Sequence, residues 1–478
     1  MMRRFARLVA VLLSVLLGQG AARAESDAVE TLLRILKEKG VLTEQEVEVV
    51  RRELAAEALT AGCPGQLPAA EKTPPAVEAV NVPPPAETAE PSFAEKDRVL
   101  ATLEKAGLSG DFRLRYDFTA RDPGIGSFDW LRHRGRFRLR VGLHFEPTDT
   151  VEVGFRLATG SGVANSTNQT FGEYGRPKHI FIDQAYAVWR PNRRLTFTGG
   201  RYANPFTTGF LVWDPDVSWE GAAVRWTERT ERGEIYAQVG SFFLDSSSGN
   251  LAPPVMLGYQ VGGRMELTSD MTLSAGLSWY DFSHLDQYGV KDLSNPDSFV
   301  AYNHLHGQQM LFDAEGRLVN RFDPLEFRVD LTAWRKSALP LTFFGHLIQN
   351  RAADLEDWLA QSVSGPAGDP ELLLRYGGED RSWGYQLGVD LGRARASRAW
   401  YGGYTYQVLE DYAFPAVFAD SDFFDGYPNN RGHAFRIGYN LSENITFLNS
   451  IFLVQREDSA KDGVRRDRRW LADVLIRI

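Results

Sequence analysis

Hydrophobic and polar residues alternate along most of the chain beyond residue 110. The segment GRFRLRVGLHF, residues 135–145, has apolar side chains at every second position from Phe137 to Phe145. Side chains of a β-strand point alternately to opposite faces, so this segment predicts a strand with one apolar and one basic face. The basic face consists of Arg132, Arg134, Arg136, Arg138, Arg140 and His144.

Sixteen segments share this two-residue period. Most have about the 9–11 residues with which a tilted strand crosses a membrane. The segments are residues 110–119, 131–146, 151–158, 179–190, 195–202, 219–227, 234–244, 256–268, 271–282, 325–335, 341–349, 382–392, 399–410, 432–441, 445–455 and 468–478.

The connections between these segments alternate in length. Six of them are short turns, with the sequences PTDT, PNR, SD, KSALP, RARAS and SEN. A membrane-spanning barrel has short turns at one end and long loops at the other, whereas a soluble β-sandwich has no reason for this alternation. The long connections are residues 159–178, 203–218, 283–324, 350–381 and 411–431.

Periodicity alone does not decide what the apolar rows contact: the interior of a soluble sandwich or the lipid around a barrel. Two features favour the barrel. The apolar rows are almost free of charge, and one charge at the midplane of a membrane barrel costs about 2–4 kcal/mol. Aromatic residues also gather at the ends of the rows, where the two membrane interfaces would lie. They are Phe112, Phe145, Trp226 and Phe447 at one end, and Phe118, Phe243, Trp279, Trp383 and Trp470 at the other.

We therefore predict an all-β fold, a 16-stranded antiparallel transmembrane β-barrel over residues 110–478. The last segment, RWLADVLIRI, places Trp470, Val474 and Ile476 on one face. Paired with the first strand, it would close the sheet and leave no edge. A barrel of sixteen strands is wide enough to enclose an aqueous channel.

The N-terminal region is predicted to be processed and helical. Basic residues, a short apolar run and the sequence ARA predict a signal peptide, residues 1–24, because the run is too short for a membrane anchor. Residues 25–60 predict a short periplasmic helical segment, which forms a coiled-coil bundle or packs on itself or on the main domain. Residues 61–92 are a Pro/Ala-rich linker, and residues 93–109 predict a short helix before the barrel.

Composition narrows the class of protein. The 478 residues have a net charge of −9, which argues against a nucleic-acid partner. A single cysteine, Cys63, excludes a disulfide framework. Hydrophobic residues make up 43% of the chain, so the sequence is not disordered along its length. We expect no cofactor and no bound metal.

Three stretches carry a resemblance to a known family. LLRILKEKGVLTEQEVEVV in the helical segment, LSGDFRLRYDF at the start of the barrel, and IDQAYAVWRPNRRLTFTGGRYANPF at residues 182–206 resemble the bacterial outer-membrane family of putative porins. The resemblance implies an outer-membrane channel for passive diffusion of small hydrophilic solutes, surrounded by lipid and often homotrimeric. One departure is the last residue, Ile478, where such barrels commonly have an aromatic residue.

The inward rows contain the candidate pore-lining residues. Arginines on three neighbouring strands would form a basic wall, which either attracts anions, as the arginine ladder of phosphate-selective porins does, or is balanced by acids opposite. The balancing acids would be Glu266, Glu326, Asp330 and Asp390. The predicted pore-lining residues are Arg113, Arg115, Arg132, Arg134, Arg136, Arg138, Arg140, Arg156, Arg264, Glu266, Arg328 and Asp330.

The long connection at 203–217 is the candidate constriction loop. Its sequence NPFTTGFLVWDPD is too apolar to stand freely in water, so we expect it to fold into the barrel or pack on the rim. Its candidate residues are Asn204, Phe206, Asp214 and Asp216, and the two aspartates would face the arginines.

Two other classes of function compete with a channel. An outer-membrane barrel enzyme, a lipase or protease, needs a nucleophile with a nearby base, but no GxSxG or HExxH motif occurs. His304 and His306 have a spacing that could bind a metal, although such pairs are more often chance. A structural tether, in which residues 25–60 contact peptidoglycan, is the second alternative.

Overall fold

The computed structural model describes residues 106–122, 130–246, 252–296, 298–362, 380–394, 396–456 and 466–477. The predicted signal peptide, helical segment and linker, and residues 93–105 of the predicted short helix, lie outside this range. In the part of the chain that is described, no helix is long and apolar enough to cross a bilayer.

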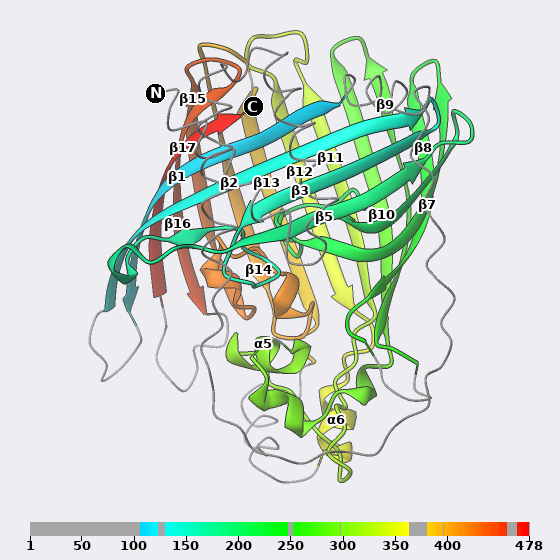
Figure 1. Cartoon of the computed structure of the whole chain (residues 1–478), viewed down its shortest axis with the longest axis vertical. Helices are drawn as coiled ribbons and strands as arrows, with labels where there is room; N and C mark the ends of the chain where they lie inside the picture. The colour runs from blue at the N-terminus through cyan, green and yellow to red at the C-terminus, as the bar shows by residue number, and fades with distance from the viewer. Residues whose placement is uncertain are drawn as a thin grey trace, which may run out of the picture. The chain divides into compact units, whose positions relative to one another are not determined.

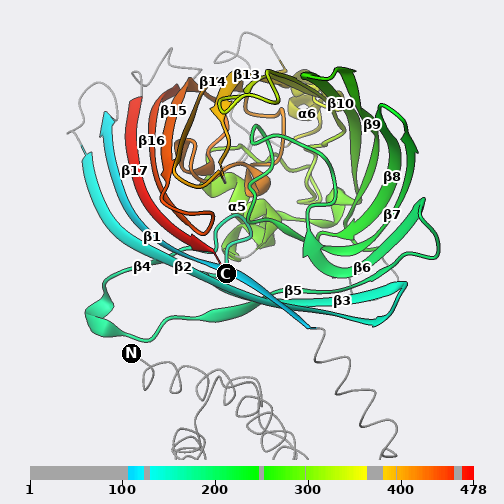
Figure 2. The same ribbon diagram turned by 90° about the horizontal axis from the view of Figure 1, so that it is seen from above.

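The described residues form a closed antiparallel sheet of sixteen long strands, as predicted (Figures 1 and 2). A two-residue strand, β4 (Gln169–Thr170), adds to the edge of β2. The sixteen strands are β1 (Gly107–Asp122), β2 (Trp130–Thr148), β3 (Val151–Thr159), β5 (Ile180–Trp189), β6 (Leu195–Ala203), β7 (Ser218–Thr230), β8 (Gly233–Phe243), β9 (Val255–Thr268), β10 (Met271–Ser283), β11 (Pro324–Ala333), β12 (Leu341–Asn350), β13 (Trp383–Gly392), β14 (Ala399–Leu409), β15 (Asn430–Asn440), β16 (Ile445–Arg456) and β17 (Arg466–Arg477).

The first and last strands close the barrel. β1 pairs with β2 on one side and with β17 on the other, with Phe118 opposite Trp470 and Arg115 opposite Asp473. The prediction that 93–109 is helical is wrong for its last three residues, because β1 begins at Gly107 and pairs there with His144.

The outer surface is apolar, as the alternation predicted. Outward side chains such as Val261, Leu387 and Ile437 are more than half exposed. Rings near the strand ends stack across neighbouring strands, as Tyr259 does on Trp279 with 5.1 Å between ring centroids. Hydrocarbon at the centre and aromatic rings at the rims match the environment of a bilayer.

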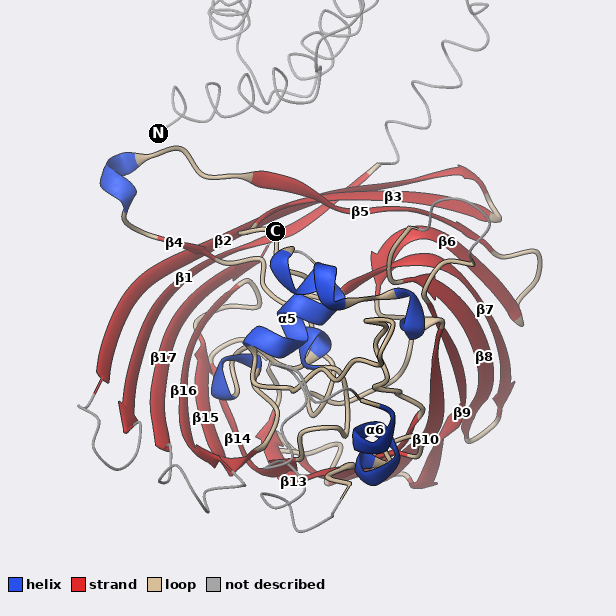
Figure 3. Ribbon diagram, turned by 90° about the horizontal axis from the view of Figure 1, so that it is seen from below, coloured by secondary structure: helices blue, strands red, loops and turns tan. Residues whose placement is uncertain are grey.

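The long loops hold the short helical elements. These are η1 (Glu173–Gly175), η2 (Leu285–Gln287), η3 (Val290–Ser294), α5 (Phe299–Leu305), α6 (Leu355–Gln361), η4 (Ala416–Phe418) and η5 (Phe424–Gly426). Helices α5 and α6 lie together at one end of the strands (Figure 1). Viewed along the barrel, α5, α6 and the loops around them lie within the outline of the strands, whereas the part of loop 160–179 that carries η1 lies outside it (Figure 3).

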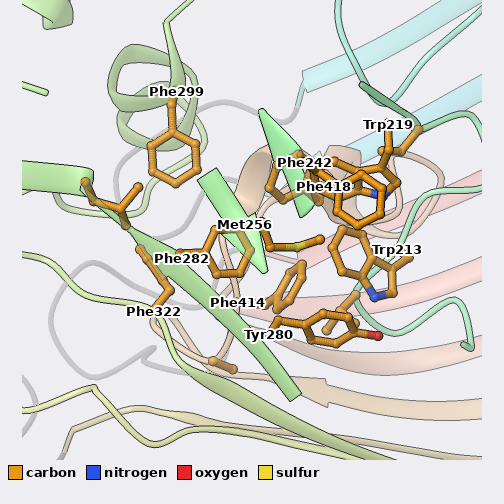
Figure 4. Packing of buried hydrophobic residues seen from close by; sticks show 14 of the residues in the cluster. Trp213, Trp219, Phe242, Met256, Tyr280, Phe282, Phe299, Phe322, Phe414 and Phe418 are labelled. Carbon is orange, nitrogen blue, oxygen red and sulfur yellow. The ribbon is translucent and has the colours of Figure 1, made fainter. Parts of the chain in front are cut away.

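The interior next to β6–β10 is a packed aromatic core (Figure 4). Trp213 of loop 204–217 contacts Trp219 of β7, Tyr280 of β10 and Phe414 of loop 410–429, with ring centroids 5.3, 5.2 and 4.6 Å apart. The expectation of a charged, water-filled interior is therefore wrong on this side. Apolar loop residues and apolar inward residues bury one another there, at roughly 25 cal/mol for each Å² removed from water.

Candidate functional site

The arginines of β1 and β2 lie side by side on the inner wall of the barrel. In the pairing of the two strands, Arg113 is opposite Arg138 and Arg115 is opposite Arg136. Like charges in directly opposed positions destabilise a sheet unless opposite charges lie close by. We call the group Arg113, Arg115, Arg132, Arg134, Arg136, Arg138 and Arg140 the arginine wall.

Aspartates on β1 and on the neighbouring strand β17 neutralise part of the arginine wall. Asp111 of β1 lies 2.8 Å from the guanidinium of Arg138 and also pairs with Arg140. Asp473 of β17 accepts a hydrogen bond from Nε of Arg115 at 2.7 Å. Asp117 of β1 pairs with Arg134 and with Arg469 of β17, and it is buried along with Arg469.

Two inward-folded loops supply the remaining carboxylates. Asp216 of loop 204–217 lies 3.2 Å from Arg138 and 3.3 Å from Arg140. Asp422 of loop 410–429 pairs with Arg115. Asp425 of the same loop lies 2.9 Å from Arg132 and 3.0 Å from Arg121 of β1.

The acids predicted to balance the arginines have other partners. Glu266 pairs with Arg335, Glu326 with His346, Asp330 with Arg328, and Asp390 with Arg436. That prediction assumed that charge must be balanced across an open bore. It is wrong because the loops fold inward and bring carboxylates directly onto the wall.

Arg113 has no carboxylate partner among the described residues. It donates a hydrogen bond to the side-chain oxygen of Asn168 in loop 160–179, and its Nε is buried without an acceptor. Arg136 is weakly held, 3.4 Å from the hydroxyl of Ser166 and 3.7 Å from Asp117. The wall is therefore mostly, but not fully, compensated.

Loop 204–217 crosses the interior, from β6 towards β11 and back to the arginine wall. The side chain of Asn204 accepts a hydrogen bond from the backbone N–H of Phe206 at 3.0 Å, and the Phe206 ring packs in the aromatic core. The backbone of Thr207 forms hydrogen bonds of 2.9 and 2.8 Å with the Gln260 side chain of β9. The hydroxyl of Thr208 donates to Glu326 of β11, which anchors the far point of the loop.

Asp214 joins the two inward-folded loops and does not contact the arginine wall. Its carboxylate accepts backbone hydrogen bonds at 2.8 Å from both Ser421 and Asp216. Its own N–H donates to the carbonyl of Phe418 at 2.8 Å. The prediction that both aspartates face the arginines is therefore correct for Asp216 and wrong for Asp214. The turn points the Asp214 carboxylate at the backbone N–H groups of Ser421 and Asp216 instead.

Four of the carboxyls on the two inward-folded loops, Asp214, Asp216, Asp420 and Asp422, differ in acidity. Burial, together with the nearby Asp216 and Asp420, raises the pKa of Asp214 well above its ordinary value. Burial and the neighbouring Asp422 raise the pKa of Asp420 to about 7. Burial opposes ionisation of Asp216 and Asp422 as well, but nearby arginines outweigh it and lower both pKa values, that of Asp216 to about 2.

Between the loops and the wall lies a cavity of about 240 Å³. Three members of the arginine wall, Arg113, Arg115 and Arg138, line it together with Arg436 and Arg477. The loops contribute Phe210, Pro215, Asp420, Asp422 and Phe423, and the inward faces of the strands contribute Phe344, Gln386, Tyr401, Gln407 and Asp473, among others. This cavity is the candidate functional site.

The other predicted pore-lining residues do not line the cavity. Arg156 of β3 pairs with Asp183, and Arg264 of β9 is exposed. Arg328 of β11 lies 3.0 Å from Asp330 and donates to the carbonyl of Thr208. Sequence reasoning missed Asp111, Asp422, Asp425 and Asp473 as partners of the wall. The acid-rich stretch DSDFFDG at 420–426 was the available signal.

His306, one of the two histidines considered as a metal ligand, is held by contacts with α5. His306 caps α5, stacks on Tyr302 with ring centroids 4.0 Å apart, and hydrogen-bonds the Tyr302 carbonyl at 2.8 Å. Over the described ranges, no group of three or more His, Cys, Asp or Glu residues is arranged to hold a metal ion.

Comparison with known proteins identifies a family. Residues 119–298 and 291–456 match the family model described as "Putative porin". No curated protein matches the sequence. Among solved structures, OprB of Pseudomonas putida at high pH is similar, with 13% identity and a TM-score of 0.47 over 79% of this chain and 96% of that one.

Two further structures are similar to the chain. OmpF of Salmonella typhi, in complex with daunomycin, has 9% identity and a TM-score of 0.44, over 78% of this chain and 97% of that one. OccK8 (OprE) of Pseudomonas aeruginosa has 11% identity and a TM-score of 0.41, over 78% and 98%.

Proposed function

The chain belongs to the putative porin family, and from this premise we propose that it forms a water-filled outer-membrane channel for passive diffusion of small hydrophilic solutes, with a modest preference for anions. One observation carries the proposal: two loops fold inward and narrow the interior against the arginine wall. The cavity that remains is lined by five arginines and three aspartates.

The anion preference rests on incomplete compensation of the arginine wall. Arg115, Arg138 and Arg436 each pair with at least one carboxylate, so most of their charge is compensated locally and they contribute less to the preference for anions. Arg113 faces the cavity without an ion pair to any of the described carboxylates. A cation that is not ion-paired in a narrow aqueous passage favours anions without excluding cations.

Reversal potentials of the reconstituted channel in a KCl gradient test both parts of the proposal. We expect ohmic single channels with a weak anion preference, which Arg113→Glu shifts towards cations. Arg193→Glu in the exposed turn between β5 and β6 is the matched control and should leave the reversal potential unchanged. Absence of single-channel conductance would contradict the channel, whereas conductance that ignores the charge at position 113 would contradict the anion preference alone.

We propose that the exported chain begins after Ala24 and that three copies associate. The surface around β4 supports association, because Phe171 and Tyr174 are exposed on loop 160–179 next to the outward face of β2, where Phe171 stacks on Phe137. The N-terminal sequence of the purified protein and its mass in detergent test the two points. A tether role for residues 25–60 stays a prediction.

We also propose that the barrel acts without catalysis. Most of the charges in the arginine wall are engaged in ion pairs, as Arg138 is with Asp111 and Arg115 is with Asp473. The two candidate histidines, His304 and His306, lie in and next to α5. Hydrolysis of ester and peptide substrates by the purified barrel would contradict this part of the proposal.

A further inference from the structure

Two aromatic rings lie on the inner wall at the cavity. Phe344 of β12 is directly opposite Gly388 of β13, and Tyr401 of β14 is directly opposite Gly438 of β15. A Cβ atom at either glycine would overlap the ring. Each ring therefore lies over the backbone of the neighbouring strand, and both line the cavity.

The loop on the other side of the cavity presents a third ring. Phe210 is half exposed, although the next three residues of its loop are buried in the aromatic core. Phe210 also lines the cavity. An apolar ring in contact with water is stabilised by any solute that covers it, and ring contacts contribute about 0.5–1.5 kcal/mol beyond the buried area.

One guanidinium of the same cavity, that of Arg113, makes no ion pair with the described carboxylates. Arg115 is held by Asp422 and Asp473, Arg138 by Asp111 and Asp216, and Arg436 by Asp390. Arg113 has only a neutral side-chain partner, Asn168, and its buried Nε lacks an acceptor. A carboxylate is the group that a guanidinium binds best, through charge-assisted hydrogen bonds.

We propose that this cavity is a transient binding site for small carboxylates that carry a ring. The carboxylate contacts Arg113, and the ring contacts the aromatic surface of Phe210, Phe344 and Tyr401. The volume of about 240 Å³ suits a single ring with its carboxylate. The inference rests on the proposed channel function and adds a substrate class to it.

Block of the chloride current tests the inference on single channels of the full chain. Benzoate, acetate and glucose are added in turn, because acetate has the charge without the ring and glucose has a ring without the charge. We expect benzoate to block at a concentration about tenfold lower than acetate, and glucose to block weakly. Arg113→Gln should raise the benzoate concentration for half-block by about tenfold.

The aromatic contribution has a matched control on the same strand. Phe344→Leu should weaken benzoate block by about threefold to tenfold and leave acetate unchanged. Phe343→Leu makes the same change on the outward face, where Phe343 is half exposed, and should change neither. Tyr401→Leu provides a second inward variant if Phe344→Leu does not assemble.

The outcomes separate this inference from the proposed function. A barrel without chloride current contradicts the channel itself. A channel that benzoate and acetate block equally, or that responds alike to Phe344→Leu and Phe343→Leu, overturns the binding site and leaves the channel standing. Block by glucose at lower concentration than benzoate would also overturn it, because the cavity would then select uncharged sugar rings.

Discussion

The two sides of the barrel interior hold loop 204–217 by different interactions, apolar packing on one side and ion pairs on the other. On the β6–β10 side, Trp213 packs among rings from the strands and from loop 410–429. On the β17–β1–β2 side, Asp216, three residues further along the chain, pairs with Arg138 and Arg140. One side of loop 204–217 is thus anchored by buried apolar surface and the other by charge.

The difference shows how a narrow channel can be stable and still carry a field. Apolar burial is non-directional, scales with area and, unlike an ion pair, is not screened by salt; the area buried on the aromatic side supplies most of the anchoring energy. Ion pairs contribute less net stability because each charge loses its hydration. They are directional, however, and therefore determine where the loop meets the wall and which charges stay uncompensated.

Removing the tryptophan that loop 204–217 contributes to the aromatic side should have the largest effect. Trp213→Ala leaves a cavity in the core and should destabilise the closed position of loop 204–217 by about 3–5 kcal/mol. We expect a higher and noisier single-channel conductance and faster hydrogen exchange in residues 204–217. Heat-modifiable migration on gels should persist, because the strands of the barrel do not depend on this residue. An unchanged conductance would show that the loop does not narrow the channel.

Removing the carboxylate on the charged side should have a smaller effect on the same loop. Asp216→Asn should destabilise its closed position by about 2–3 kcal/mol, at the low end for a buried ion pair, because Arg138 and Arg140 keep Asp111. Anion preference should rise, since two arginines lose a compensating charge. Hydrogen exchange and reversal potentials measure the two effects. If Asp216→Asn made hydrogen exchange in residues 204–217 faster than Trp213→Ala does, the ion pairs would anchor the loop more strongly than the aromatic packing.

The selectivity of the charged side should depend on pH through Asp420. Its pKa is raised to about 7, so the carboxyl is ionised at pH 8 and neutral at pH 6. Lowering the pH therefore removes negative charge from the cavity, and anion preference should increase between pH 8 and pH 6. Asp420→Asn should abolish this pH dependence and give the higher anion preference at both pH 6 and pH 8. A pH dependence that persists in Asp420→Asn would assign it to another group.

The salt concentration should also distinguish the charged side from the aromatic side, and this is the smallest of the expected effects. Raising KCl from 0.1 to 1 M shortens the screening length from about 10 to about 3 Å. We expect the anion preference to decrease, whereas hydrogen exchange at residues 211–213 should stay the same. Loss of protection at these residues in high salt would mean that charge, and not apolar packing, holds the loop.

The sequence by itself determined the barrel. Membrane strands have a side-chain period of two, one face in lipid and short turns at one end, and each of these constraints acts within a few neighbouring residues. The alternation around Phe137–Phe145 and the outward positions of Val261 and Ile437 were therefore predictable. The closure of β1 on β17 followed from the pattern of the last ten residues.

Only the tertiary structure decided the interior. The partners of Arg138 and Arg115 include Asp216 and Asp422, which come from loops far along the chain, and no local pattern specifies where a long loop folds. The same applies to Phe210 and Tyr401: Phe210 lies on loop 204–217 and Tyr401 on β14, yet both line one cavity. Local periodicity reports what a strand faces at short range, whereas the contents of a barrel depend on contacts between distant segments that form only when the sheet closes.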